Sequence, residues 1–191
     1  MGTRKNIIVI EGPSGVGKDT VYNKLTEEYP NTYSKVASYT TRDMRPGEIE
    51  GITYFFVDKK TFMQKVQSGD IFEYTTRHGA YRGISKTPLE KIIKKNLIAV
   101  KDADVIGLRA LRGAYPNKVL GIFITADKEV IKTRLIKRGG CDQDIERRLN
   151  DYDNSHAYIN EYDYVIINNG PVEEAVEKIR KILEEENGTN A

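Results

Sequence analysis

The sequence lacks several features that would assign it to a class of protein at once. It has no tryptophan, only two histidines and a single cysteine, Cys141. One cysteine cannot form an internal disulfide, and no cluster of His and Cys has the spacing of a zinc site. No apolar run approaches the roughly 20 residues that cross a bilayer, and no signal-peptide core follows Met1. We therefore expect a cytoplasmic protein in a reducing compartment, without membrane contact.

A strong excess of charge is also missing. The formal net charge is +2 over 191 residues, of which 30% are charged and 39% hydrophobic. Such a small excess does not predict binding to nucleic acid. The length and apolar content fit one globular domain over residues 1–191, and nothing in the pattern specifies an oligomeric state.

Short apolar runs alternate with stretches of helical spacing. Residues 7–10, Ile-Ile-Val-Ile, form a continuous β-branched run, which is typical of a strand that is covered on both faces. Similar runs lie at 97–100, 119–124 and 164–167, and a helix is predicted at about 19–29. This alternation predicts an α/β fold of three layers around a mostly parallel sheet, with the core in residues 4–34 and 96–186.

Two segments differ from this pattern. Residues of about 35–95 are rich in Thr, Tyr, Gly and Phe and contain the short alternating piece 54–57, which predicts an inserted lobe of mixed structure. Residues of about 139–158 begin with Gly-Gly and are charged, the composition of a mobile helical lid. The polar tail from Glu184 onward is expected to fray.

Residues 12–18, Gly-Pro-Ser-Gly-Val-Gly-Lys, follow the first predicted strand and precede a helix, the context that a Walker A loop (P-loop) requires. Glycines let backbone N–H groups surround phosphate oxygens, and the helix N-terminus adds its positive dipole end. Lys18 can reach the β- and γ-phosphates. We therefore expect ATP to bind at Gly12, Pro13, Ser14, Gly15, Val16, Gly17, Lys18, Asp19 and Thr20.

Asp19 occupies the position where this motif usually has a Ser or Thr hydroxyl for Mg²⁺, and Thr20 comes one residue later. Because Mg²⁺ favours carboxylate oxygen, Asp19 and Thr20 are candidate ligands, directly or through water. An acidic residue in the first turn of a helix also stabilises the helix dipole. The sequence is compatible with both interpretations of Asp19.

Residues 38–54 read Ser-Tyr-Thr-Thr-Arg-Asp-Met-Arg-Pro-Gly-Glu-Ile-Glu-Gly-Ile-Thr-Tyr, with two arginines three positions apart. Guanidinium groups bind pairs of phosphate oxygens, so this segment is either a phosphate site or a solvated charged loop. It resembles the guanylate kinase family, whose signature S-x-T-T-R-x-x-R-x-G-E-x-x-G-x-x-Y it matches at every fixed position. Together with the P-loop and the charged insertion, the resemblance extends over nearly the whole chain.

The resemblance implies transfer of the γ-phosphate of ATP to GMP, with Mg²⁺ as cofactor. Glu73 falls where the family places a carboxylate against guanine, which presents N1–H and an amino group as donors. The implied acceptor contacts are Ser38, Arg42, Arg45, Glu48, Tyr54, Glu73, Arg82 and Asp104.

Two segments depart from the family pattern. Residues 82–84 read Arg-Gly-Ile where the family has Tyr-Gly-Ser or Tyr-Gly-Thr, so Arg82 can serve the phosphate but Ile84 cannot donate to guanine O6. Tyr81 or Ser85 compensates if the alignment slips by one residue. Residues 102–107 resemble D-x-D-x-Q-G with isoleucine in place of glutamine. There Asp102 is either a magnesium ligand or a solvated strand end.

Four arginines, Arg134, Arg138, Arg147 and Arg148, bracket the Gly-Gly insertion. Phosphoryl transfer needs positive charge near the γ-phosphate, although surface helices also carry arginines for solubility. The resemblance implies the catalytic set Lys18, Arg42, Arg134, Arg138 and Arg148.

No general base is expected, because the acceptor phosphate is already charged. His78 and His156 are therefore predicted to be surface or capping residues. Asn168 either approaches adenine or forms a turn.

Three alternatives remain. Ile84 favours dGMP or another nucleoside monophosphate as acceptor. Asp19 favours ribose 1,5-bisphosphate, whose kinases resemble this chain in their Gly-Lys-Asp. A third alternative is a non-catalytic guanylate kinase-like binding module.

Overall fold

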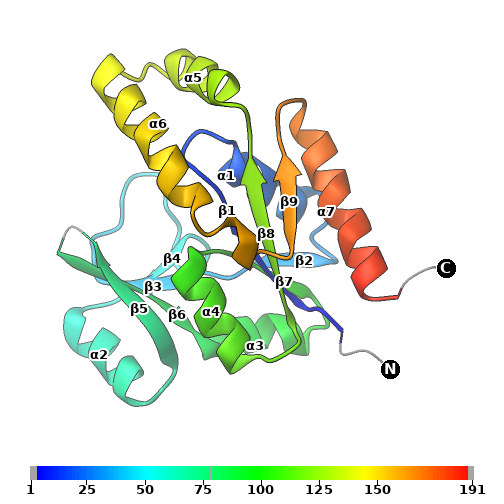
Figure 1. Ribbon diagram of the computed structural model, residues 1–191. Helices are drawn as coiled ribbons and strands as arrows, with labels where there is room; N and C mark the ends of the chain where they lie inside the picture. The colour runs from blue at the N-terminus through cyan, green and yellow to red at the C-terminus, as the bar shows by residue number, and fades with distance from the viewer. Residues whose placement is uncertain (1–3, 78, 189–191) are drawn as a thin grey trace.

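The computed structural model describes residues 4–77 and 79–188, in which five parallel strands form a central sheet (Figure 1). The strand order is β2-β7-β1-β8-β9. The strands are β1 (Ile7–Glu11), β2 (Tyr33–Lys35), β7 (Ile98–Asp102), β8 (Val119–Thr125) and β9 (Tyr164–Ile167). The predicted α/β fold with a parallel central sheet is confirmed.

Helices cover both faces of this sheet, as the unbroken apolar run in β1 requires. Ile8 and Ile10 pack on one face, while Ile7 and Val9 pack on the other. The first face is covered by α1 (Lys18–Glu28), α5 (Lys128–Lys137) and α7 (Val172–Glu186). The second is covered by α3 (Lys86–Lys94) and α4 (Val105–Ala114). The residues of β1 are therefore apolar at every position up to Glu11, where this strand ends.

A second sheet, here called the lobe sheet, lies beside the central one (Figure 1). Its order is β4-β3-β6-β5, with β3 and β4 parallel and the other pairs antiparallel. Its strands are β3 (Ser38–Thr40), β4 (Tyr54–Phe56), β5 (Ile71–Arg77) and β6 (Ala80–Ser85). Helix α2 (Lys59–Gln67) covers one face, where Tyr39, Phe62 and Ile71 form a small core. His78 lies outside the described residues.

Residues 139–158 contain α6 (Asp142–His156), which the short helix η1 (Ile159–Glu161) follows. The last turn of α6 is fixed to the end of β8, because Thr125 Oγ1 lies 2.9 Å from His156 Nε2 and 3.3 Å from Tyr152 Oη. The His156 ring also packs against Phe123. His156 is half-buried as the last residue of α6, and its Nδ1 lies 2.8 Å from Tyr152 O, so the structure is compatible with the predicted surface or capping role and adds the contacts to β8. Its position four residues after Tyr152 turns both rings toward β8.

The C-terminal segment is more ordered than its polar composition predicts. Helix α7 continues to Glu186, and the Asn187 side chain then accepts a hydrogen bond from Lys5 N at 2.7 Å and donates to Lys5 O at 3.1 Å. The prediction that the chain frays from Glu184 is thus wrong up to Gly188, because these paired bonds hold the helix end.

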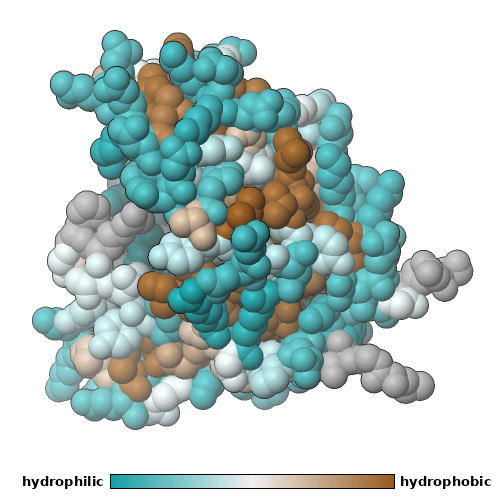
Figure 2. All heavy atoms as spheres, in the orientation of Figure 1, coloured by the Kyte–Doolittle hydropathy of each residue, from teal (hydrophilic) through white to brown (hydrophobic). Residues whose placement is uncertain are grey.

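The surface is mainly polar, but apolar side chains emerge over β9, whose Val165 and Ile167 are exposed (Figure 2). Over the stretch of chain that the structure covers, none of the helices combines the length and apolar character needed to span a membrane.

Candidate functional site

Residues 12–18 form a tight loop between β1 and α1. A Cβ on Gly12 would overlap the carbonyl oxygen of Ile124 in β8. The loop can therefore pass this close to β8 only with glycine at this position. Gly15 and Gly17 have φ of 90° and 91°, a backbone conformation that favours glycine. Gly17 precedes α1, and no side chain in the described part of the chain caps that helix. The first N–H groups of α1 therefore remain available for an anion.

Two side chains from distant elements hold this loop in place. Val16 O accepts a hydrogen bond from Asn168 Nδ2 at 2.8 Å and another from Arg134 Nη1 at 3.0 Å. Asn168 is buried directly after β9, and this supporting role was not among the roles predicted for it. The signal for it was the amide side chain at the carboxyl end of a strand next to the loop.

Lys18 begins α1, and its ammonium lies 3.4 Å from the Asp19 carboxylate. The Asp19 side chain is 78% exposed, and Thr20 is exposed beside it. Both side chains are therefore accessible to a metal ion bound at the loop. Asp19 also stands in the first turn of α1, so the two interpretations of this residue remain compatible with the structure.

The face of the lobe sheet opposite α2 carries several predicted acceptor residues. Ser38 pairs with Tyr54, and Thr40 pairs with both Phe56 and Arg82, so these side chains share one face. A β-bulge between Ile71 and Glu73 places Glu73 opposite Ile84 on this face. The register thus gathers Ser38, Tyr54, Glu73 and Arg82.

Arg42 is the centre of a charged cluster at the end of this face where Glu48 and Tyr54 lie. Its guanidinium forms a two-pronged ion pair with Glu48 and lies 5.0 Å from the centre of the Tyr54 ring, as does that of Arg82. The hydrogen bond from Arg42, together with one from the Arg45 backbone, lowers the pKa of Glu48 to about 2. Arg42 Nε is enclosed and has no hydrogen-bond partner among the described residues. Arg45 contributes only its backbone, and its side chain is exposed.

Carboxylates collect at the carboxyl ends of β1 and β7. Asp102 ends β7 and is exposed, while Asp104 caps α4 by accepting from Ile106 N and Gly107 N. Burial, and then Asp104 and Asp102, raise the pKa of Glu11 to about 8, and Tyr162 Oη donates to it. Glu11 was not predicted as a site residue, although an acidic residue directly after a buried apolar run is a visible signal in the sequence.

Within residues 4–77 and 79–188, no three His, Cys, Asp or Glu side chains lie close enough together to form a metal site by themselves. Mg²⁺ in phosphoryl-transfer enzymes is usually held by one or two carboxylates together with substrate phosphates and water. The exposed carboxylates of Asp19 and Asp102 fit that kind of site.

The four arginines that bracket the Gly-Gly insertion differ in their positions. Arg134 bonds the loop at Val16, and Arg148 bonds both Ser14 Oγ and the Asp144 carboxylate, the latter at 2.6 Å. Arg147 also bonds Asp144 but is 68% exposed and does not contact the loop. Arg138 is exposed at the end of α5, close enough to Arg134 to lower its pKa in addition to the effect of burial. The structure therefore brings Arg134 and Arg148 to the loop but not Arg138.

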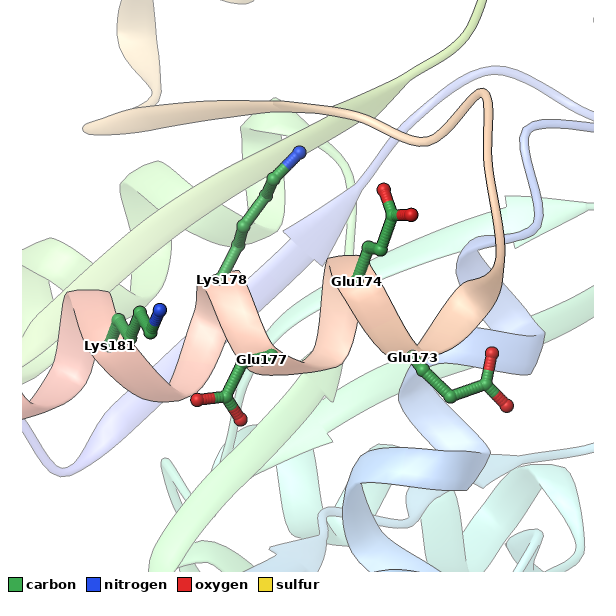
Figure 3. A pocket seen from close by; sticks show the side chains of 5 residues that line it. All are labelled: Glu173, Glu174, Glu177, Lys178 and Lys181. Atoms are coloured by element: carbon green, nitrogen blue, oxygen red, sulfur yellow. The ribbon is translucent and has the colours of Figure 1, made fainter.

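A separate hollow of about 400 Å³ lies on the surface of α7 (Figure 3). All its lining residues belong to one helix, and Glu174 and Lys178 extend to one side of it while Glu173 points away. Glu173 instead pairs with Lys24 of α1 at 2.9 Å. No residue of the predicted site lines this hollow, which we interpret as the space between solvated charged side chains.

The parallel sheet, the glycine loop with Lys18, the lobe sheet and the arginine-bearing α6 together define a P-loop kinase. Residues 4–186 match the model of the family described as guanylate kinase. The chain belongs to the guanylate kinase family, and it is a kinase, as the sequence resemblance predicted.

Individual relatives agree with this assignment. The chain is 36% identical to a guanylate kinase of Helicobacter pylori (strain ATCC 700392 / 26695) over 93% of this chain and 84% of the relative. It is 35% identical to a guanylate kinase of Chlamydia felis over 93% of this chain and 86% of the relative. Among solved structures, the guanylate kinase from Anaplasma phagocytophilum superposes with a TM-score of 0.72 at 30% identity, covering 99% of this chain and 89% of that chain.

Proposed function

We propose that the protein transfers the γ-phosphate of ATP to GMP, giving ADP and GDP. The observation that carries this proposal is the shared face of the lobe sheet, with an arginine–tyrosine cluster at one end and Glu73 farther along it. The Arg42 and Arg82 guanidinium groups, which lie against the same Tyr54 ring, can bind a dianionic phosphate. Glu73 can accept from the N1–H and amino group of guanine.

The site for ATP is the loop of residues 12–18. Its backbone N–H groups and the start of α1 would surround the β- and γ-phosphates, with Lys18 adding a positive charge. Mg²⁺ would be held by Asp102 and by Asp19 or Thr20, directly or through water, and when bound it neutralises phosphate charge.

Positioning and charge neutralisation would supply most of the rate. An oxygen of the acceptor phosphate attacks the γ-phosphorus in line with the departing ADP, and it is already charged near neutral pH. Arg134 and Arg148 lie at the loop, where they can stabilise the charge that develops on the phosphoryl group. Closure of α6 over the loop would exclude water, which otherwise competes as acceptor.

The test is an assay of ADP release with Mg²⁺ and ATP against GMP, dGMP, AMP, CMP, UMP and ribose 1,5-bisphosphate. We expect GMP to give the highest kcat/KM and the Lys18→Ala variant to lose at least about 10²-fold in kcat. If dGMP, a nucleotide without guanine or ribose 1,5-bisphosphate gives the highest kcat/KM, that compound replaces GMP as the proposed acceptor. Absence of ADP release with all of them would instead support a non-catalytic binding module.

A further inference from the structure

Lys101 stands out because a charged side chain is rarely buried without a partner. Among the described residues, it is the only Asp, Glu, Lys or Arg that is less than a tenth exposed, at 7%. No group in the described part of the chain accepts a hydrogen bond from its ammonium, yet that nitrogen is not among the fully enclosed unpartnered atoms. The Lys101 nitrogen is therefore almost fully enclosed, with only a small accessible area.

The strand register shows on which side of the central sheet Lys101 lies. Lys101 pairs with Val9 in β1, and Val9 packs on the same face of the central sheet as Ala99, α4 and Ile84. This is the side on which the lobe sheet contacts the core through Ile84 of β6. Lys101 therefore points from the central sheet toward the face of the lobe sheet that carries Glu73.

The charges around Lys101 agree with this placement. Burial raises the pKa of Glu73, and Lys101 opposes that rise. Burial lowers the pKa of Lys101, whereas the carboxylates of Asp102 and Glu73 oppose that fall. Glu73 and Lys101 thus lie within electrostatic range of each other, an acceptor on the lobe sheet and a donor on the central sheet.

Ile84, the residue beside Glu73, cannot supply a hydrogen-bond donor for the O6 carbonyl of guanine. Ile84 faces Glu73 across the β5–β6 pair and is buried, with its Cδ1 against the start of α4 near Gly107. It offers no hydrogen bond to a base. A guanine whose N1–H and amino group face a carboxylate presents its O6 carbonyl next to them, and this carbonyl needs a donor.

We propose that Lys101 recognises the 6-oxo group of the purine acceptor, donating from its ammonium to O6 while Glu73 accepts from N1–H and the 2-amino group. This inference rests on the proposed function and names its specificity-determining residue. Adenine carries an amino group at C6, which would leave the ammonium and the carboxylate without partners. A site built to hydrogen-bond one group rejects a substrate that lacks it more strongly than an apolar pocket does.

The test compares the wild type with Lys101→Met, an apolar side chain of similar length, on GMP, 6-thio-GMP and IMP. The 6-thio analogue keeps N1–H and the amino group but replaces O6 with a weakly accepting sulfur, whereas IMP keeps O6 and lacks the amino group. We expect Lys101→Met to lose about tenfold to a hundredfold in kcat/KM for GMP, mainly through KM. The preference for GMP over 6-thio-GMP should shrink by a similar factor, with the preference for GMP over IMP and the KM for ATP unchanged.

Two further variants separate recognition from folding. Lys101→Gln retains an N–H donor and should keep part of the preference for GMP over 6-thio-GMP. Ile84→Ser in the Lys101→Met background places a hydroxyl beside Glu73 and should restore that preference. An unchanged preference in folded Lys101→Met, or an equal loss on all three acceptors, would overturn the inference. Failure of the wild type to phosphorylate GMP would instead refute the proposed function, independently of Lys101.

Discussion

At the scale of single residues, Gly12 in the glycine loop and Gly113 in α4 should respond in opposite ways to substitution by alanine. Gly12→Ala would place a methyl group against the Ile124 carbonyl, which is backbone and cannot move aside easily. We expect this variant to lose about 1–3 kcal/mol of unfolding free energy in urea denaturation. Gly113 is exposed in α4 with open space around it, so Gly113→Ala should gain about 0.5–1 kcal/mol. Equal effects of the two substitutions would contradict the steric argument.

Glu11 predicts a specific dependence of stability on pH. Its pKa is about 8 in the folded protein, against an ordinary value of 4.5. Between these values the folded protein holds a proton that the unfolded chain has released, so stability falls as pH rises through this window and is lowest above about 8.

Glu11→Gln removes this titration but keeps an oxygen that can accept from Tyr162 Oη. Without nucleotide or metal, the Tm of the two proteins should be similar near pH 4.5, and the variant should become increasingly more stable toward pH 8. Parallel Tm curves across that window would show that Glu11 has an ordinary pKa in the folded state.

At the scale of elements, α6 offers a matched pair of arginines. Arg147 and Arg148 both bond Asp144, but only Arg148 reaches Ser14 in the loop. We expect Arg148→Ala to lower kcat by about 10²-fold, because charge at the γ-phosphate is lost. Arg147→Ala should change kcat less than twofold, since it removes only an exposed ion pair. The measurement is steady-state ADP release at saturating ATP and GMP. Similar losses in both variants would mean that the pair acts by holding α6 together.

The elements were predictable from sequence where the signal is local. Strand β9 coincides with the predicted 164–167, and the buried run before residues 12–18 became β1, because β-branched runs and glycine turns specify their own conformation. Contacts between elements were harder to predict from the sequence. The bulge before Glu73 and the register that places Ile84 beside it depend on pairing between β5 and β6. The burial of Lys101 and Glu11 depends on packing around them, which no local pattern encodes.

At the scale of the whole molecule, the start and the end of the described chain are joined. Asn187, after α7, exchanges two hydrogen bonds with the backbone of Lys5, just before β1. We expect Asn187→Ala to lose about 1–3 kcal/mol of unfolding free energy, because both bonds disappear. The exposed Glu185→Ala, two residues earlier, should be neutral within about 0.5 kcal/mol. Denaturant titration measures both, and kcat should stay unchanged in both. A stability loss from Glu185→Ala as large as that from Asn187→Ala would attribute the effect to the helix end itself.

The position of the single cysteine gives the protein a built-in reporter. Cys141 is exposed and precedes the first residue of α6, the helix that carries Arg148 to the phosphate loop. A maleimide dye would attach at one site on the native sequence, with no other thiol to remove. If α6 closes over the loop as proposed, the dye emission would follow that closure in real time, and separate titrations with ATP and GMP would show which substrate drives it.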